Sequence, residues 1–465
     1  MKNIKVILAV LLFSTISACK RAEFLEKKPS SDLLVPTTLK DFQAILENTN
    51  VMSFAGGLAQ ISSDDYVVDD ANYDAVSTLT QRNAYTWEKD LYSGETAIKD
   101  WNVLYKQVFY SNAVLEGLDK SIQKDSEQGK FLRGWALFCR AFAFYDLVRN
   151  FCKVYQPITA NSDLGIPLRL KSGIDYVQQR ASLQESFDQI ISDLTEAEKL
   201  LPRSRPATNL NRPSLPALYA LLARIYLDMG SFALAESNAD KALEIYSTLI
   251  DYNTISKSSS VPFTVNNEEL LYNTSQVASY GEFTGSYVGT RARIAPDLIA
   301  LYSSNDLRLN IFFAQQSDRT YTIKSGYVGL GSYPFTGLAT DELYLIKSET
   351  QARKGLTNQA LNTINTLMLK RWNPTATNPA KPFQQITANS SSEALDKILL
   401  ERRKELVWRS LRWFDIKRLN LIGANIMLNR KVKGKSYSLA PNDPRYVFPI
   451  PDDEISQSGI KQNIR

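Results

Sequence analysis

Apolar positions repeat with helical spacing over long parts of the chain. The spacing predicts a helix that begins after Thr37-Thr38, a pair of helices over 101–118, and a helix over 131–150 that is apolar on most of its sides. A helix of that kind is buried between other helices. The segment Ser182-Leu-Gln-Glu185 is a capping box and predicts the start of a further helix. Together these patterns predict a mainly α-helical protein.

Residues 216–247 carry the clearest sign of an internal repeat. Two helical patterns flank Gly230, and small residues stand at Ala223, Ala235 and Ala242. This spacing matches the small positions of a tetratricopeptide repeat, where two antiparallel helices approach closely. A degenerate second copy runs over 344–360 with Gly355 at its turn. Because one repeat cannot bury its own apolar face, we predict a tetratricopeptide-like solenoid of about four stacked helix pairs.

Two long segments interrupt the helical pattern. Residues 50–95 and 251–340 are rich in Ser and Tyr, and we predict them as irregular loop insertions with short strands only at 269–273 and 321–324. Loops of this length are usually functional or disordered. Residues 393–419 predict one long charged helix. The expected fold class is therefore mainly all-α with minor short strands, and its helical scaffold comprises about 37–49, 96–250 and 340–420.

The N-terminus has the layout of a secretory signal peptide. A basic start precedes an apolar run over 6–13, and small or polar residues follow. That run is too short to cross a bilayer with a hydrocarbon core of about 30 Å. The segment Ile16-Ser17-Ala18-Cys19 resembles a bacterial lipobox, whose cysteine is acylated before cleavage. We therefore expect a signal peptide at 1–18, a lipid anchor on Cys19 and a tether at 19–36; the alternative is a secreted protein that is cleaved elsewhere.

Composition excludes several kinds of chemistry. The chain has no histidine, which removes Ser-His-Asp and Cys-His catalysis and His-ligated zinc. The net charge of +5 is small for 465 residues, and no basic stretch is long enough to indicate nucleic-acid binding. Cys139 and Cys152 lie too far apart along a predicted helix to form a disulfide, so we predict both as free thiols.

Five acidic residues gather in the first insertion, at Asp64, Asp65, Asp69, Asp70 and Asp74. Adjacent carboxylates could hold Ca²⁺, but the glycine and glutamate of an EF-hand are missing, so we expect a solvated loop and no cofactor. A glycoside hydrolase needs two carboxylates at a set distance, and nothing in the sequence marks such a pair. We therefore predict a protein without enzymatic activity and keep a surface glycoside hydrolase as an alternative.

Several motifs occur behind the lipobox in the order typical of one family. They are Phe24-Leu-Glu-Lys-Lys-Pro29, Trp101-Asn-Val-Leu-Tyr105, Leu164-Gly-Ile-Pro-Leu168, Glu401-Arg-Arg-Lys-Glu-Leu406, Arg412-Trp-Phe-Asp-Ile-Lys-Arg418 and Phe448-Pro-Ile-Pro451. In this order the chain resembles the SusD/RagB family of Bacteroidetes surface lipoproteins, over nearly all of the mature chain. The charged helix containing two of these motifs is expected to be architectural, with Glu405 paired to Arg409 and with Glu401, Arg402 and Arg412 at a helix seam.

The resemblance implies a function in nutrient capture. It implies an outer-membrane location facing the cell exterior and a SusC-like TonB-dependent β-barrel transporter as the partner, which the chain covers like a hinged lid. It implies glycans or oligosaccharides as ligands, although some relatives serve peptide uptake, and that alternative stays open. The resemblance also implies one SusD-like domain over 37–465.

Sugar recognition needs aromatic rings for the C–H faces and polar groups for the hydroxyl rims. The two insertions supply such side chains, which we predict as ligand-binding residues: Asp65, Tyr66, Tyr73, Arg82, Tyr85, Tyr280, Tyr287, Arg291, Tyr327 and Tyr333. A rigid scaffold that carries variable loops is a common way to build a binding site. Some of these tyrosines are expected to pack under the loops, and Trp87 and Trp101 are expected in the core.

Overall fold

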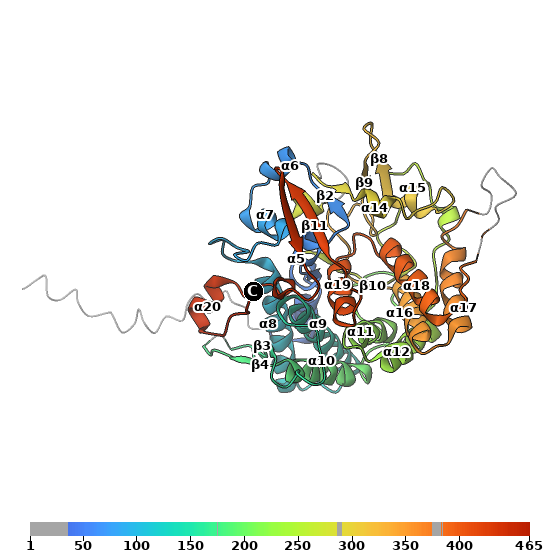
Figure 1. The fold of residues 1–465 in the computed structure, drawn as a ribbon. Coiled ribbons are helices and arrows are strands. Elements are labelled where there is room, and N and C mark those ends of the chain that lie inside the picture. Colours follow the sequence, from blue (N-terminus) through green and yellow to red (C-terminus); the bar gives the residue numbers. More distant parts are fainter. Residues whose placement is uncertain (1–35, 174, 286–290, 374–382, 384) are drawn as a thin grey trace, which may run out of the picture.

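The computed structural model describes residues 36–465 except 174, 286–290, 374–382 and 384. Two regions are visible in Figure 1, one built from long helices and one from short helices and strands. Within the described ranges, no helix is long and apolar enough to span a membrane. The predicted signal peptide, the predicted acylation site Cys19 and most of the predicted tether lie outside the described residues.

The long helices form the scaffold. They are α3 (Leu39–Leu46), α8 (Lys99–Lys120), α9 (Glu127–Phe151), α10 (Leu183–Glu198), α11 (Leu215–Asp228), α12 (Phe232–Ile245), α16 (Thr340–Arg353), α17 (Thr357–Leu369), α18 (Ser391–Glu405) and α19 (Arg412–Leu421). The short helices are α4 (Thr49–Met52), α5 (Leu58–Ser62), α6 (Asp70–Asp74), α7 (Leu79–Thr86), α13 (Gly281–Thr284), α14 (Pro296–Ile299), α15 (Arg308–Phe312) and α20 (Asp452–Ser458), with 3₁₀ turns at Tyr252–Thr254 and Pro444–Tyr446.

The strands are short and pair two at a time. They are β1 (Phe54–Ala55), β2 (Tyr66–Val67), β3 (Leu164–Pro167), β4 (Arg180–Ser182), β5 (Leu270–Tyr272), β6 (Ser275–Gln276), β7 (Arg293–Ile294), β8 (Phe313–Gln315), β9 (Tyr321–Ile323), β10 (Leu338–Ala339), β11 (Leu428–Val432) and β12 (Lys435–Leu439). The two strands predicted from sequence are confirmed as β5 and β9. Only β1 with β6 is parallel among the pairs in the described ranges.

Helix α9 is the centre of the scaffold. It packs against α3, α8 and α10, and nearly all of its residues are buried, as its all-round apolar pattern predicts. The predicted capping box is present at Ser182 in front of α10, and the predicted helix start after Thr37-Thr38 is confirmed, with a capping box at Thr38 in front of α3. The predicted pair of helices over 101–118 is wrong, because α8 continues unbroken through that segment. Trp87 and Trp101 are both buried in the core, as expected.

The predicted repeat is confirmed. Helices α11 and α12 pack closely, and Ala223, Ala235 and Ala242 are fully buried where they meet. Gly230 has φ +72° and makes the turn between them, while Gly355 has φ +80° between α16 and α17. Helix α16 lies against α12, α17 and α18, so the second copy stacks on the first.

The predicted loop insertion at 50–95 is wrong in part. It holds α5, α6, α7 and most of α4, together with β1 and β2, and several of its side chains are in the core. These helices are too short to show a helical period in the sequence. Asp69 caps α6 and Thr78 caps α7, each accepting a hydrogen bond from a backbone N–H group.

The single charged helix predicted over 393–419 is also wrong. Helix α18 ends at Glu405 and α19 begins at Arg412. Between them Trp408 has φ +59° and Ser410 has φ +54°, which a helix cannot accommodate. The indole Nε1 of Trp408 donates to Thr284 O at 2.9 Å, so tertiary packing outweighs the local helical preference.

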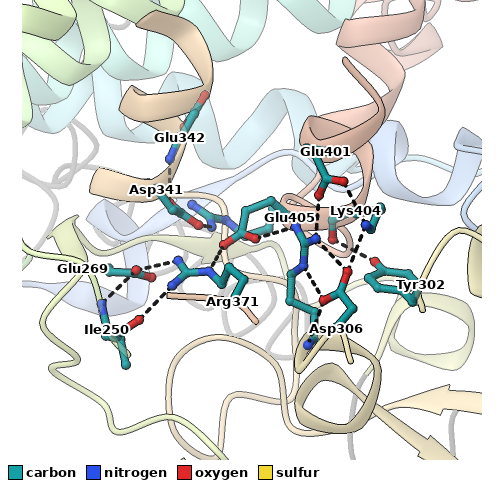
Figure 2. Close-up of polar contacts among 12 residues, drawn as sticks. Ile250, Glu269, Tyr302, Asp306, Asp341, Glu342, Arg371, Glu401, Lys404 and Glu405 are labelled. Atoms are coloured by element: carbon teal, nitrogen blue, oxygen red, sulfur yellow. Dashed lines mark hydrogen bonds and ion pairs between the residues drawn. The ribbon is translucent and has the colours of Figure 1, made fainter. Parts of the chain in front are cut away.

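Because of that turn, the expected Glu405–Arg409 pair does not form. Arg409 instead binds Asp341 at 2.6 Å, and Glu405 binds Arg371 at 2.6 Å and Arg308 at 2.9 Å. Figure 2 shows Asp341, Arg371 and Glu405 as members of one polar network. Arg371 also binds Glu269 at 2.6 Å, and both side chains have no exposed surface. The motifs are therefore architectural, as predicted, but with other partners.

The C-terminal segment returns to the N-terminal half of the chain. The hydroxyl of Tyr92 donates to Pro449 O at 2.6 Å, and Trp101 Nε1 donates to Glu454 Oε2 at 3.1 Å. Near the end, Asn463 Nδ2 donates to Phe151 O at 2.8 Å. Residues near both ends of the described range, from Leu39 to Ile460, thus share one core. Cys139 and Cys152 are free and buried, as predicted.

Candidate functional site

The two predicted insertions meet at paired strands. Strand β1 of the first lies parallel to β6 of the second, and β2 pairs antiparallel with β7, with Tyr66 opposite Ile294. Helix α13 lies between β6 and β7 in the sequence. Two buried hydrogen bonds hold the last residue of α13: Gln276 Nε2 donates to Thr284 Oγ1 at 2.7 Å, and Trp408 Nε1 donates to Thr284 O. The described parts of the two insertions are therefore joined to each other around α13.

Two partly exposed tyrosines flank α13. The Tyr73 ring stacks on Phe283 with 6.5 Å between ring centroids and 20° between planes. Tyr333 lies so close to Gly281 that a β-carbon there would stand 3.2 Å from its ring. A side chain at position 281 would therefore displace Tyr333. Both rings keep part of their surface in solvent, where a flat apolar face of a ligand could contact them.

Glu282 organises the polar side of the same helix. Its carboxylate accepts hydrogen bonds from Ser77 Oγ at 2.5 Å and from Ser77 N at 3.1 Å, and it lies 3.4 Å from Arg291 Nε. Burial acts to raise the pKa of Glu282, but the hydrogen bonds from Ser77 outweigh it, so its pKa lies below the ordinary value of 4.5. Arg291 is thereby held at the surface by an ionised partner.

A polar groove of about 430 Å³ lies beside this helix. Its walls come from the start of α7, from the segment before α8 and from the segment before α13. The polar residues that line it are Thr78, Thr80, Glu95, Thr96, Lys99 and Ser279. Glu95 is already engaged, since it accepts from Leu79 N at 2.7 Å and Thr80 N at 3.0 Å. Hydroxyls that donate and accept, an amine and two nearby aromatic rings form a surface suited to a polyhydroxylated or amide-rich ligand.

The sequence matches two family models. One, described as "Starch-binding associating with outer membrane", matches residues 23–227, and the other, described as the SusD family, matches residues 332–464. These matches lie on either side of the insertion that carries α13.

The chain belongs to the SusD family.

Individual SusD relatives agree with this assignment. A SusD-like protein P2 of Formosa agariphila is 26% identical over an alignment of 390 positions, and the match covers 72% of this chain and 73% of the relative. The fold matches a putative sugar binding protein of Bacteroides vulgatus, with TM-score 0.73, 22% identity, and coverage of 92% of this chain and 99% of that one. It also matches a SusD superfamily protein of Bacteroides thetaiotaomicron, with TM-score 0.73, 20% identity, and coverage of 92% and 100%. At this level of identity the structures establish a shared fold.

Half of the predicted ligand residues are core residues in this SusD fold. The side chains of Asp65, Tyr66, Tyr85, Tyr280 and Tyr327 are all at most 7% exposed. The hydroxyl of Tyr66 donates to Ile61 O, that of Tyr85 accepts from Val68 N, that of Tyr280 donates to Asp100 and that of Tyr327 donates to Glu269. These side chains fasten the insertions to the scaffold and expose little surface, although Tyr280 also contributes to the wall of the groove beside α13.

The remaining predicted residues are near the surface. Three of them come together around α13, namely Tyr73, Arg291 and Tyr333. Arg82 is partly exposed, and its backbone carbonyl accepts a hydrogen bond from the Tyr73 hydroxyl at 3.4 Å. Tyr287 lies outside the described residues. The sequence analysis missed Glu282 and the hydroxyls of the groove, because single Glu, Ser and Thr residues in a polar segment give no distinguishing signal.

The predicted solvated loop is correct in part, since Asp69, Asp70 and Asp74 are exposed, whereas Asp64 and Asp65 are engaged inside the protein. Asp64 binds Arg412 at 2.7 Å, Asp65 is buried beside it, and Asp74 binds Lys433 at 2.9 Å. Burial and the neighbouring Asp64 raise the pKa of Asp65 to about 6. In the described part of the chain, no group of three or more acidic or thiol side chains is placed to hold a metal ion.

Proposed function

We propose that the chain is a non-catalytic surface lipoprotein that binds glycans or oligosaccharides and passes them to a TonB-dependent outer-membrane transporter. The binding surface is the one around α13, with Tyr73 and Tyr333 as stacking rings and Arg291 as a hydrogen-bond donor. The lipid on Cys19 holds the protein at the outer membrane, facing the cell exterior. The observation that carries this proposal is the grouping of Tyr73, Arg291 and Tyr333, from three separate segments, around helix α13 and beside a hydroxyl-lined groove.

The chemistry of the groove suits binding more than bond cleavage. Its hydroxyls are of the kind that exchange hydrogen bonds with sugar hydroxyls, and the rings are placed to cover sugar C–H faces. The nearby carboxylates, Glu95 and Glu282, are each held by several protein donors. Family membership supports the same proposal, because the model over residues 23–227 is described as starch-binding.

A ligand screen tests the proposal. The protein without its first 19 residues is applied to an array of oligosaccharides and, in parallel, to an array of oligopeptides. Retention of oligosaccharides supports glycan uptake, and retention of peptides alone favours the alternative function in peptide uptake. Release of new reducing ends from any retained glycan contradicts the non-catalytic assignment.

Variants then locate the site. Tyr333→Ala and Arg291→Ala are each expected to weaken binding of the best array ligand about fivefold, which corresponds to about 1 kcal/mol for one lost aromatic or polar contact. Tyr110→Ala serves as a matched control, because Tyr110 is a partly exposed tyrosine on scaffold helix α8. Calorimetry in which all three variants bind like the unaltered protein would place the ligand elsewhere.

The anchor and the transporter need separate tests. Cys19→Ala in the full chain is expected to move the protein from the membrane fraction to the soluble fraction, and mass spectrometry of the unaltered N-terminus is expected to find acyl chains. Chemical cross-linking on whole cells is expected to join the protein to a large β-barrel protein. Membrane attachment that survives Cys19→Ala argues against the anchor without touching the ligand proposal.

A further inference from the structure

A second crevice lies outside the insertions, at the end of α9. It has a volume of about 540 Å³, within the range of about 300–1,000 Å³ typical of small-molecule sites. Its walls come from the segment after α9, from α19, from the turn at 442–447 and from the C-terminal residues 461–464. It shares no lining residue with the groove beside α13.

The crevice has a positive charge balance. Its two carboxylates are already paired, Asp163 with Lys153 at 2.7 Å and Asp443 with Arg445 at 2.8 Å. Two further cations line it, the buried Lys417 and the exposed Lys461. A negatively charged ligand in the crevice would therefore lie near two ammonium groups, the buried one of Lys417 and the exposed one of Lys461.

Lys417 is the unusual member of this set. It is 6% exposed, and its ammonium donates to Arg149 O at 2.7 Å and to Cys152 O at 3.2 Å. An ammonium group has three donors, so two carbonyl partners leave one. Among the described residues no carboxylate lies within ion-pair distance of the Lys417 ammonium group. Burial lowers the pKa of Lys417 to about 8, although Cys152 and Asp228 act to raise that pKa. A buried charge without a counter-ion is costly, and a bound anion would compensate it.

Tyr446 supplies a second unpaired donor. Its side chain is 4% exposed, and within the described ranges its hydroxyl proton has no acceptor, although the Asn420 side chain interacts with the hydroxyl oxygen. The rest of the wall is largely apolar and includes Val154, Leu421 and Val447. Ile464 is 84% exposed at the rim, where an occupant of the crevice would cover it.

We propose that this crevice binds a small organic carboxylate, with the carboxylate between Lys417 and Tyr446 and an apolar body against Val154, Leu421 and Val447. One buried cation matches one negative charge, and the apolar wall matches a carbon skeleton. An acidic monosaccharide and a plain aliphatic acid share this chemistry. The site is independent of the glycan surface around α13.

Calorimetry with sodium glucuronate, sodium hexanoate and glucose tests the proposal. At least one of the two carboxylates is expected to bind, and glucose is expected not to bind in the crevice. Tyr446→Phe keeps the shape of the core and is expected to weaken carboxylate binding about tenfold or more, because a hydrogen bond to a charged group is lost. Lys461→Gln is expected to weaken it about two- to fivefold, as for an exposed ion pair. The controls are Tyr437→Phe and Lys431→Gln on the β11–β12 hairpin, and Tyr333→Ala at α13.

The outcomes are distinct. Binding of glucuronate alone identifies an acidic-sugar site, and binding of hexanoate identifies a site for simple carboxylic acids. The proposal is overturned if neither carboxylate binds better than glucose, or if binding is unchanged in Tyr446→Phe and Lys461→Gln. Loss of binding in Tyr333→Ala alone would assign the carboxylate to the α13 surface and would also overturn it. Thermal unfolding of Tyr446→Phe is expected at or above that of the unaltered protein, since the variant removes a buried unpaired hydroxyl.

Discussion

Glu269 makes the stability of this scaffold depend on pH. Its carboxylate has no exposed surface, accepts from Ile250 N at 3.0 Å and shares Arg371 with Glu405 (Figure 2). Burial raises the pKa of Glu269 from the ordinary value of 4.5 to about 7, and the negative charges of the nearby Asp341 and Glu405 act in the same direction. The attraction of Arg371 acts to lower the pKa but is outweighed. In the folded state Glu269 is therefore protonated at pH values where the unfolded chain has already lost that proton.

The sign and size of the effect follow from linkage. A raised pKa in the folded state gives a stabilisation that is complete below pH 4.5 and is lost as the pH rises to about 7. Each pKa unit corresponds to about 1.4 kcal/mol, so the change over this window is about 3 kcal/mol. Glu269→Gln resembles the protonated form and does not titrate. The difference in unfolding free energy between this variant and the unaltered protein should therefore move by about 3 kcal/mol in favour of the variant between pH 4.5 and 7.5.

Urea unfolding followed by tryptophan fluorescence at four pH values between 4.5 and 7.5 measures this difference. Glu268→Gln is the matched control, because Glu268 is the adjacent residue and is exposed. Its difference from the unaltered protein should stay constant over the same window. The reasoning is refuted if the Glu269→Gln difference is also constant, or if it moves the other way. The second result would mean that Arg371 keeps the carboxylate ionised throughout.

Three further predictions concern the scaffold. The first uses the protein without Cys19, whose two remaining thiols are Cys139 and Cys152. Because burial raises their pKa values to about 12 and about 11, they are expected to react with a disulfide reagent only after urea unfolds the protein. Fast reaction of the folded protein would contradict this. Gly230→Ala is expected to cost about 1 kcal/mol in urea unfolding, because φ is +72° in otherwise open space; Gly173→Ala, at ordinary φ, is the control and should cost less. Ser182→Ala is expected to cost about 1 kcal/mol through loss of the α10 cap, whereas Ser192→Ala on the exposed face of α10 should not; equal effects would argue against the capping role.

Local sequence signals predicted the scaffold well. The helical spacing around α9, the capping box at Ser182 and the small residues that close α11 onto α12 each act through neighbours in the sequence, so they can be recognised without the fold. The turn between α18 and α19 could not be recognised in this way. The backbone at Trp408 leaves the helical region because the indole binds Thr284, more than a hundred residues away.

The candidate site was predicted less completely for a related reason. A tyrosine in a polar insertion can cover a ligand or fasten the insertion to the core, and both uses look alike in a sequence. Tyr280 and Tyr333 illustrate this, since Tyr280 is buried on Asp100 and Tyr333 stays partly exposed against Gly281. Their difference arises from where α13 lies, which depends on strand pairs between distant segments.

The return of the last residues to the N-terminal half bears on how well the protein resists proteases. The hydroxyl of Tyr92, the indole of Trp101 and the carbonyl of Phe151 have their partners only where residues 449–463 are present. A copy that stops short of them leaves polar groups of its core without partners, which opens that region to proteases. Resistance of the helical scaffold to digestion is therefore expected to depend on residues 449–463, more than three hundred positions away from the groups that they cover.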